Sequence, residues 1–157
     1  MTGMENAMRA LEAMRKHYAQ RDLAAREWKK KGGKVVGRAG LSVPEELIIA
    51  AGCLPILLTG NPYISSEQGN QIMEDYFCPH VRSVHNQFVV GNYDFLDLAI
   101  FPNSTDSMRR CYYYLWYEKH KLKLDFKIPP MTIFDILHTQ KHIASKYVRG
   151  RVEAMKA

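Results

Sequence analysis

The sequence predicts an α/β protein: a parallel sheet of about four strands with helices on both faces, preceded by an N-terminal helical segment. Three observations support this fold class. Short apolar runs of strand length recur along the chain, as in strands that are covered on both faces. Segments of helical periodicity alternate with these runs, and Gly, Asn and Pro residues separate the two. Strands that alternate with helices form parallel sheets with right-handed crossovers.

Residues 1–33 are expected to form the helical segment, and residues 34–157 a Rossmann-like α/β domain. A second helix is expected over residues 22–31, and the following Gly32 and Gly33 end it. The first helix carries apolar residues at spacings of three and four, which make one stripe: Met4, Met8, Leu11, Met14 and Tyr18.

The domain is expected to begin with a strand over 34–37. Ser42 is followed three residues later by Glu45, the capping-box pattern of a helix start, and Pro44 suits that first turn. The later elements alternate in the same way. A strand is expected over 54–59, and then a helical pattern over 67–90 that Pro79 interrupts, so that two helices meet near the YFCPH segment. These are followed by a strand over 96–101, a loop over 102–105, a helix over 106–117, a strand over 122–128, a Pro129-Pro130 turn and a helix over 137–156.

The composition is that of a soluble globular protein, because 46% of the 157 residues are hydrophobic and 24% are charged. The longest apolar run, 47–58, contains Gly52 and Pro55 and is far shorter than the roughly 20 residues of a membrane helix. Charged residues interrupt the apolar start of the chain, unlike the core of a secretory signal. We therefore expect a cytoplasmic protein with no membrane partner.

Three cysteines at wide spacings, Cys53, Cys78 and Cys111, argue against a disulfide scaffold. They are either free thiols or cluster ligands. For Cys53 and Cys111 we favour buried, inert thiols, since free cysteine is among the most buried residue types. The net charge of +6 favours phosphate-bearing ligands. The densest run of positively charged residues is interpreted as a solvated helix end: Lys29, Lys30, Lys31 and Lys34.

Ligands of parallel sheets gather outside the carboxyl ends of the strands. Three loops leave these ends, over 38–42, 60–66 and 102–106, and each leads to a helix start whose free amides suit an anion. Ordinary connections with capping residues explain the same loops equally well. The candidate substrate-binding residues are polar side chains in and after these loops: Ser42, Glu45, Asn103, Ser104, Asp106 and Arg109.

Three segments carry a family resemblance: SVPEELIIAAGCLPILLTG over 42–60, YFCPHVRS over 76–83 and FPNSTDSMRR over 101–110. In their order and spacing they resemble the N-terminal part of a subunit of the 2-hydroxyacyl-CoA dehydratase and benzoyl-CoA reductase family, which includes the D-component of 2-hydroxyglutaryl-CoA dehydratase. The segments FCPHVRS and RRCYYYLWYEK favour the benzoyl-CoA reductase branch. The third segment keeps the family's proline, aspartate and arginines at Pro102, Asp106, Arg109 and Arg110.

The resemblance implies an iron-sulfur enzyme that holds a [4Fe-4S] cluster on cysteines and acts on a coenzyme A thioester. Cys78 stands at the family's first cluster cysteine, whereas Thr105 stands where the family has another. A threonine hydroxyl is hard and neutral, a poor ligand for cluster iron. Further ligands must therefore come from elsewhere, such as the second α/β domain of a full family subunit.

The implied activity is the one-electron reduction of an acyl-CoA thioester in anaerobic metabolism. The resemblance also implies two protein partners: a homologous or paralogous subunit, and an ATP-dependent activator that supplies the electron. The chain alone is not expected to be active. An alternative of another class is a cluster-free, non-catalytic binding or assembly module that retains the family scaffold, as Thr105 suggests.

Other kinds of site find less support. Cys78, His80, His85 and Cys111 offer zinc-binding side chains at a spacing that matches no compact site. An aromatic run supplies stacking faces for a nucleotide base, but basic residues do not interleave with it, so we expect a core-facing helix and no nucleic-acid binding. The run comprises Tyr112, Tyr113, Tyr114, Trp116 and Tyr117.

Overall fold

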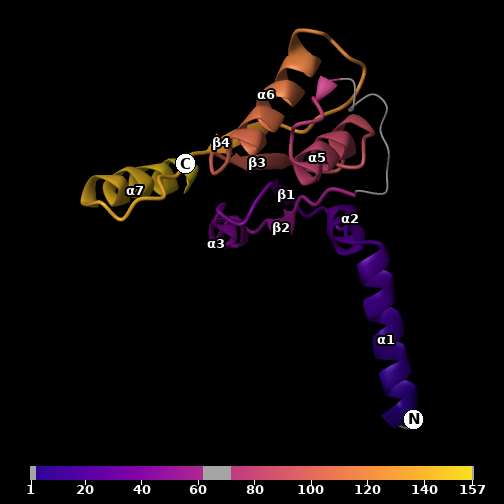
Figure 1. The fold of residues 1–157 in the computed structure, drawn as a ribbon. Coiled ribbons are helices and arrows are strands. Elements are labelled where there is room, and N and C mark those ends of the chain that lie inside the picture. Colours follow the sequence, from indigo (N-terminus) through magenta and orange to yellow (C-terminus); the bar gives the residue numbers. More distant parts are fainter. Residues whose placement is uncertain (1–2, 62–71, 157) are drawn as a thin grey trace.

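The computed structural model describes residues 3–61 and 72–156. Its centre is a four-stranded sheet in which all neighbouring strands are parallel, in the order β2-β1-β3-β4 (Figure 1). This confirms the predicted α/β class. The strands are β1 (Val35–Arg38), β2 (Leu54–Leu57), β3 (Leu98–Pro102) and β4 (Met131–Phe134).

Helices cover both faces of the sheet, as predicted. The labelled helices are α1 (Gly3–Ala19), α2 (Leu23–Lys30), α3 (Glu45–Ala50), α5 (Pro79–Val89), α6 (Asp106–His120) and α7 (His142–Lys156). α2, α5 and α6 contribute to the core on one face, and α3 and α7 to the core on the other. α1 extends away from the sheet, and none of its residues is buried (Figure 1). No helix among the described residues is both long and apolar enough to cross a membrane.

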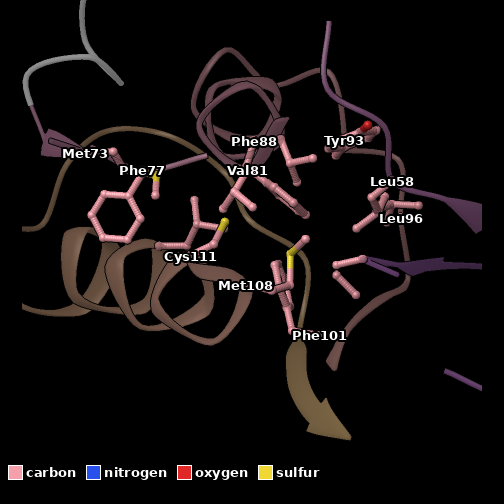
Figure 2. Packing of buried hydrophobic residues seen from close by; sticks show 14 of the residues in the cluster. Leu58, Met73, Phe77, Val81, Phe88, Tyr93, Leu96, Phe101, Met108 and Cys111 are labelled. Carbon is pink, nitrogen blue, oxygen red and sulfur yellow. The ribbon is translucent and has the colours of Figure 1, made fainter. Parts of the chain in front are cut away.

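The alternation of side chains along each strand divides the core in two. On the larger side, Val35, Ala99 and Phe101 pack with buried residues of α5 and α6, including Phe88 and Cys111 (Figure 2). The smaller side is made by Val36, Val43, Ile48, Ile100 and Phe134.

One strand prediction was wrong in part, and another was wrong altogether. β2 was expected to be covered on both faces, but it lies at the sheet edge, and Leu57 is 42% exposed. The strand predicted over 122–128 does not form. Lys123 has a φ of 54°, which an extended strand does not contain, and the fourth strand begins only after Pro130.

The helix starts also differ in detail. At Pro79 the structure agrees with the predicted break: α5 begins there, because a proline is favoured in the first turn. The predicted capping box is absent: α3 starts at Glu45 without a side-chain cap, and Glu45 forms an ion pair with Arg38 instead. α7 starts at His142 rather than at residue 137. Residues 62–66 of the predicted loop and residues 67–71, the start of the predicted helical pattern, lie outside the described residues.

Candidate functional site

The carboxyl ends of β1 and β3 form a topological switch point. β1 leads to α3 on one face of the sheet, whereas the neighbouring β3 leads to α6 on the other. Such points are the usual ligand sites of parallel sheets. The two loops also touch, since a Cβ on Gly40 would lie 3.0 Å from Cγ of Pro102. We call this side of the sheet the carboxyl edge: residues 38–42, 59–61 and 102–106, with the start of α5.

Cys78 is the N-cap residue of α5, and its side chain is exposed. Its thiol makes no capping hydrogen bond. A close contact places this helix start beside the end of β2, because a Cβ on Gly60 would lie only 2.5 Å from Cβ of Ser83. The preceding residue, Phe77, is 3% exposed and packs edge-on against Tyr114 of α6. The buried Phe77 thus fixes the position of the next residue, Cys78, whose thiol is accessible.

Thr105 is the N-cap residue of α6, so both positions at which the resemblance expects a cluster cysteine are helix caps. Its backbone is extended, and its Oγ1 accepts a hydrogen bond from the Met108 amide at 3.2 Å. Sequence reasoning missed this cap, although a threonine directly before a helix is its usual signal. The hydroxyl that replaces the family's cysteine therefore stabilises the helix start.

Ion pairs hold the first turn of α6. Arg109 and Arg110 each lie 2.6 Å from a carboxylate oxygen of Asp106. The hydrogen bond from Arg109 lowers the pKa of Asp106; desolvation opposes this effect, and the charge of Arg110 adds to the lowering. The Arg110 guanidinium also lies 5.9 Å from the centre of the Phe77 ring. The start of α6 is thereby linked to the residue before Cys78.

The structure divides the predicted substrate-binding residues into two groups across the switch point. Asn103, Ser104, Asp106 and Arg109 lie in the β3–α6 loop and the first turn of α6, whereas Ser42 and Glu45 lie between β1 and α3 or at its start.

Besides Asp106 and Arg109, which pair with each other, two more of these residues are engaged by protein partners. The Arg38 guanidinium donates to Glu45 and, at 3.3 Å, to the Gly40 carbonyl. The Asn103 amide donates to Asp135 at 2.8 Å, just after β4. Hydrogen bonds from Tyr147 and Asn103 lower the pKa of Asp135. Ser104 and Ser42 are half-buried, and Asp106 and Arg109 are exposed at the surface.

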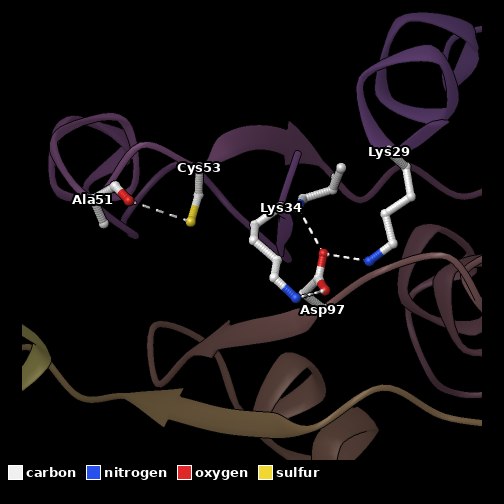
Figure 3. A network of polar contacts seen from close by, with 6 residues as sticks. Lys29, Lys34, Ala51, Cys53 and Asp97 are labelled. Carbon is white, nitrogen blue, oxygen red and sulfur yellow. Dashed lines mark hydrogen bonds and ion pairs between the residues drawn. The ribbon is translucent and has the colours of Figure 1, made fainter. Parts of the chain in front are cut away.

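The other two cysteines do not reach this edge. Cys53 is half-buried just before β2, at the opposite end of that strand, where its thiol donates to the Ala51 carbonyl at 3.7 Å (Figure 3). Cys111 is fully buried, as predicted (Figure 2). Burial, followed by the nearby charge of Glu118, raises the pKa of its thiol. Cys78 is thus the one exposed thiol of the chain.

The residues of the described chain do not assemble a metal site by themselves. Within residues 3–61 and 72–156, no group of three His, Cys, Asp or Glu side chains is placed to hold an ion. The zinc alternative fails because the fully buried His85 is 2.8 Å from Glu118. These residues likewise offer a [4Fe-4S] cluster one accessible thiol, that of Cys78. Thr105 Oγ1 is used as a helix cap, and the other two thiols are half-buried or buried away from this edge.

The amino ends of the strands carry a closed polar network (Figure 3). Asp97, before β3, accepts from Lys29 at 2.6 Å, from Lys34 at 3.1 Å and from the Val35 amide at 2.9 Å. Desolvation alone would raise the pKa of Asp97, but these hydrogen bonds outweigh it and lower the pKa to about 2. Part of the lysine run that we interpreted as solvated therefore ties α2 and β1 to β3.

A cavity of about 770 Å³ lies beside the outer edge of β2, lined in part by Thr59, Gly60, Gln87 and Tyr93. The Tyr93 hydroxyl donates to the Thr59 carbonyl at 2.7 Å, and burial raises the pKa of Tyr93 to about 12. The buried Nε2 of Gln87 has no hydrogen-bond partner. Sequence reasoning missed these residues, because they meet only through the packing of α5 on β2.

The fold and the site together define an α/β protein with a parallel sheet, a switch point and an exposed cysteine beside it. A family model described as 2-hydroxyglutaryl-CoA dehydratase, D-component, matches residues 41–157, and the chain therefore belongs to this family. It is also similar to one of the subunits of benzoyl-CoA reductase from Thauera aromatica, with 33% identity over 89 residues. That match covers 55% of this chain and 23% of the relative, so the chain corresponds to about a quarter of the relative's length.

Proposed function

We propose that this chain is a subunit, or the N-terminal part of a subunit, of an iron-sulfur enzyme of the acyl-CoA dehydratase or benzoyl-CoA reductase type. Its carboxyl edge would form one wall of the active site. One observation supports this above all: the single exposed thiol, Cys78, lies at a helix start beside the ends of the parallel strands. The family match over residues 41–157 covers most of this edge, all but β1 and residues 38–40.

In this proposal Cys78 contributes one thiolate to a [4Fe-4S] cluster whose other ligands come from outside the described residues. When bound, such a cluster supplies single electrons to a coenzyme A thioester. The chain's own contribution is to position Cys78: Phe77 fixes the start of α5 by packing against Tyr114 and beneath Arg110. We also propose a homologous or paralogous subunit and an ATP-dependent activator as its partners.

The first turn of α6 suits a phosphate or carbonyl group of the substrate. Free amides and the helix dipole favour a negative group there. Arg109 adds a guanidinium that is about half exposed and so available to a ligand, although it also pairs with Asp106. Asn103 and Ser104 precede this turn on the same loop. Ser42 and Glu45 would face the substrate from the other side of the switch point.

The test of the redox assignment is anaerobic co-expression with the subunits encoded beside this chain, followed by counting iron and acid-labile sulfide in the purified complex. The proposal predicts iron and sulfide in equal amounts, about four of each per cluster. A complete complex without iron would contradict the assignment for this chain.

The substrate-binding part is tested separately by replacing Arg109 with alanine in the same complex. Loss of a charge-assisted contact is expected to weaken coenzyme A binding about tenfold, as measured by calorimetry. The matched control is Arg149→Ala on α7, which removes an equally charged, exposed side chain away from the carboxyl edge. Equal binding by both variants would place coenzyme A elsewhere.

The hydrogen bond from Met108 to Thr105 favours a second candidate function, a cluster-free module that uses the family scaffold for binding or assembly. In that case the complex contains no iron that depends on this chain. Replacing Cys78 with serine would then leave both the assembly of the complex and its iron content unchanged.

A further inference from the structure

α1 carries an apolar face that the described chain leaves largely uncovered; the Arg21 guanidinium lies 5.4 Å from the centre of the Tyr18 ring at its end. Its five large apolar side chains lie within a sector about 120° wide, the width of a face that normally packs against a protein partner. Their exposed fractions are between 44% and 78%: Met4, Met8, Leu11, Met14 and Tyr18. α1 also projects from the sheet (Figure 1). Its 17 residues make a helix about 25 Å long at a rise of about 1.5 Å per residue. It lies outside the residues that match the family.

The order of the apolar residues is symmetric about Leu11. Met8 and Met14 lie three residues to either side of it, and Met4 and Tyr18 lie seven residues to either side. When two copies of α1 are placed antiparallel with their Leu11 residues in contact, each apolar residue therefore faces another. Met8 meets Met14 of the second copy, and Met4 meets Tyr18. A twofold axis through Leu11 generates this arrangement, and such an interface is self-complementary.

The charged residues fit the antiparallel orientation and disfavour the parallel one. Arg15 lies inside the apolar sector, and the antiparallel pairing places it opposite Ala7, which is small enough to leave the guanidinium access to water. A parallel pairing in register would instead bring Arg15 against Arg15 and place like helix ends side by side.

We propose that α1 is a homodimerisation helix, which pairs antiparallel with the α1 of a second copy of this chain around Leu11. The ten large apolar side chains of such a pair, with on the order of 100 Å² of exposed surface each, reach about the 1,000 Å² that a specific interface requires. Because α1 projects from the sheet, the two sheets lie at opposite ends of the helix pair and do not collide (Figure 1).

The first experiment measures the mass of the purified chain alone by sedimentation equilibrium over a wide concentration range. A dimer is expected, and Leu11→Lys is expected to raise its dissociation constant about a hundredfold, because each copy loses a central contact worth about tenfold. The matched control is Ala13→Lys, which adds the same side chain to the opposite, exposed face of α1 and should leave the dimer intact. Circular dichroism checks that both variants stay folded.

The orientation is tested by cysteine cross-linking, with linked peptides identified by mass spectrometry. A mixture of Met4→Cys and Tyr18→Cys chains is expected to form the mixed cross-link, whereas Met4→Cys chains alone do not link to each other through residue 4. A Met4–Met4 link would overturn the antiparallel arrangement.

Two other outcomes would overturn the proposal as a whole: a monomer at every concentration, or a dimer that Leu11→Lys leaves unchanged. A monomer that binds a different subunit through Leu11 would assign α1 to a heterologous partner instead. None of these results bears on the iron content of the complete complex, so the two proposals fail independently.

Discussion

The two edges of the sheet use similar side chains for different purposes. At the amino ends of the strands, which we call the amino edge, Asp97 accepts hydrogen bonds from two lysines and a backbone amide, and Cys53 donates to a carbonyl (Figure 3). At the carboxyl edge, Cys78 is exposed and makes no capping hydrogen bond. The same chain therefore has one edge where an aspartate and a cysteine are held by hydrogen bonds and one edge where a cysteine thiol stays accessible.

The largest expected effect concerns the amino edge. Asp97→Ala removes the acceptor shared by Lys29, Lys34 and the Val35 amide, and we expect it to lower the free energy of unfolding by about 2–3 kcal/mol. Chemical denaturation measures the change. Asp125→Ala, at an exposed position, is the control and should cost less than about 0.5 kcal/mol. Equal stability of the two variants would show that the hydrogen bonds accepted by Asp97 do not stabilise the fold at the amino edge.

The same network predicts a pH dependence. The pKa of Asp97 is about 2 in the folded chain, below its ordinary value of 3.8, so its carboxylate stabilises the fold above the ordinary pKa. This stabilisation, about 1–2 kcal/mol, is lost as the pH falls from about 5 toward 2. Denaturation of the wild type and of Asp97→Asn at several pH values isolates the contribution. The stability difference between them should shrink on acidification, and a constant difference would contradict this explanation.

A smaller effect is expected at the carboxyl edge. Thr105→Ala removes the cap of α6 and should cost about 1 kcal/mol of unfolding free energy, because the Met108 amide loses its partner. Thr105→Ser retains the oxygen and should recover most of the stability. A Thr105→Ala variant as stable as the wild type would show that the hydroxyl does not serve as a structural cap, and would weaken the contrast with Cys78.

Local sequence patterns predicted the fold where a strand or helix depends on its own residues. The apolar runs that became β2 and β3 were recognised, and so was the helix from Asp106. The alternating segment 122–128 was mistaken for a strand, because alternation alone does not reveal the left-handed backbone at Lys123. The edge position of β2 was missed as well, since strand order depends on contacts between distant segments.

The candidate site was predicted less completely than the fold. The family resemblance located Cys78 and the loop that ends at Asp106, and topology places both at the carboxyl edge. The bonds that occupy Glu45 and Asn103 were not predictable, because Arg38 and Asp135 approach them only when the strands align. The cap formed by Thr105 had a local signal, which the search for a cluster cysteine overlooked.

The comparison between the two edges is tested most directly by the iron content of the anaerobically purified complex with one cysteine replaced at a time. Cys78→Ser at the carboxyl edge is predicted to lose the iron that depends on this chain. Cys53→Ser at the amino edge is the matched control and should retain the wild-type iron content, because its thiol lies at the opposite end of β2 from the carboxyl edge and donates to the Ala51 carbonyl (Figure 3). Equal iron in both variants would contradict the assignment of Cys78 as a cluster ligand.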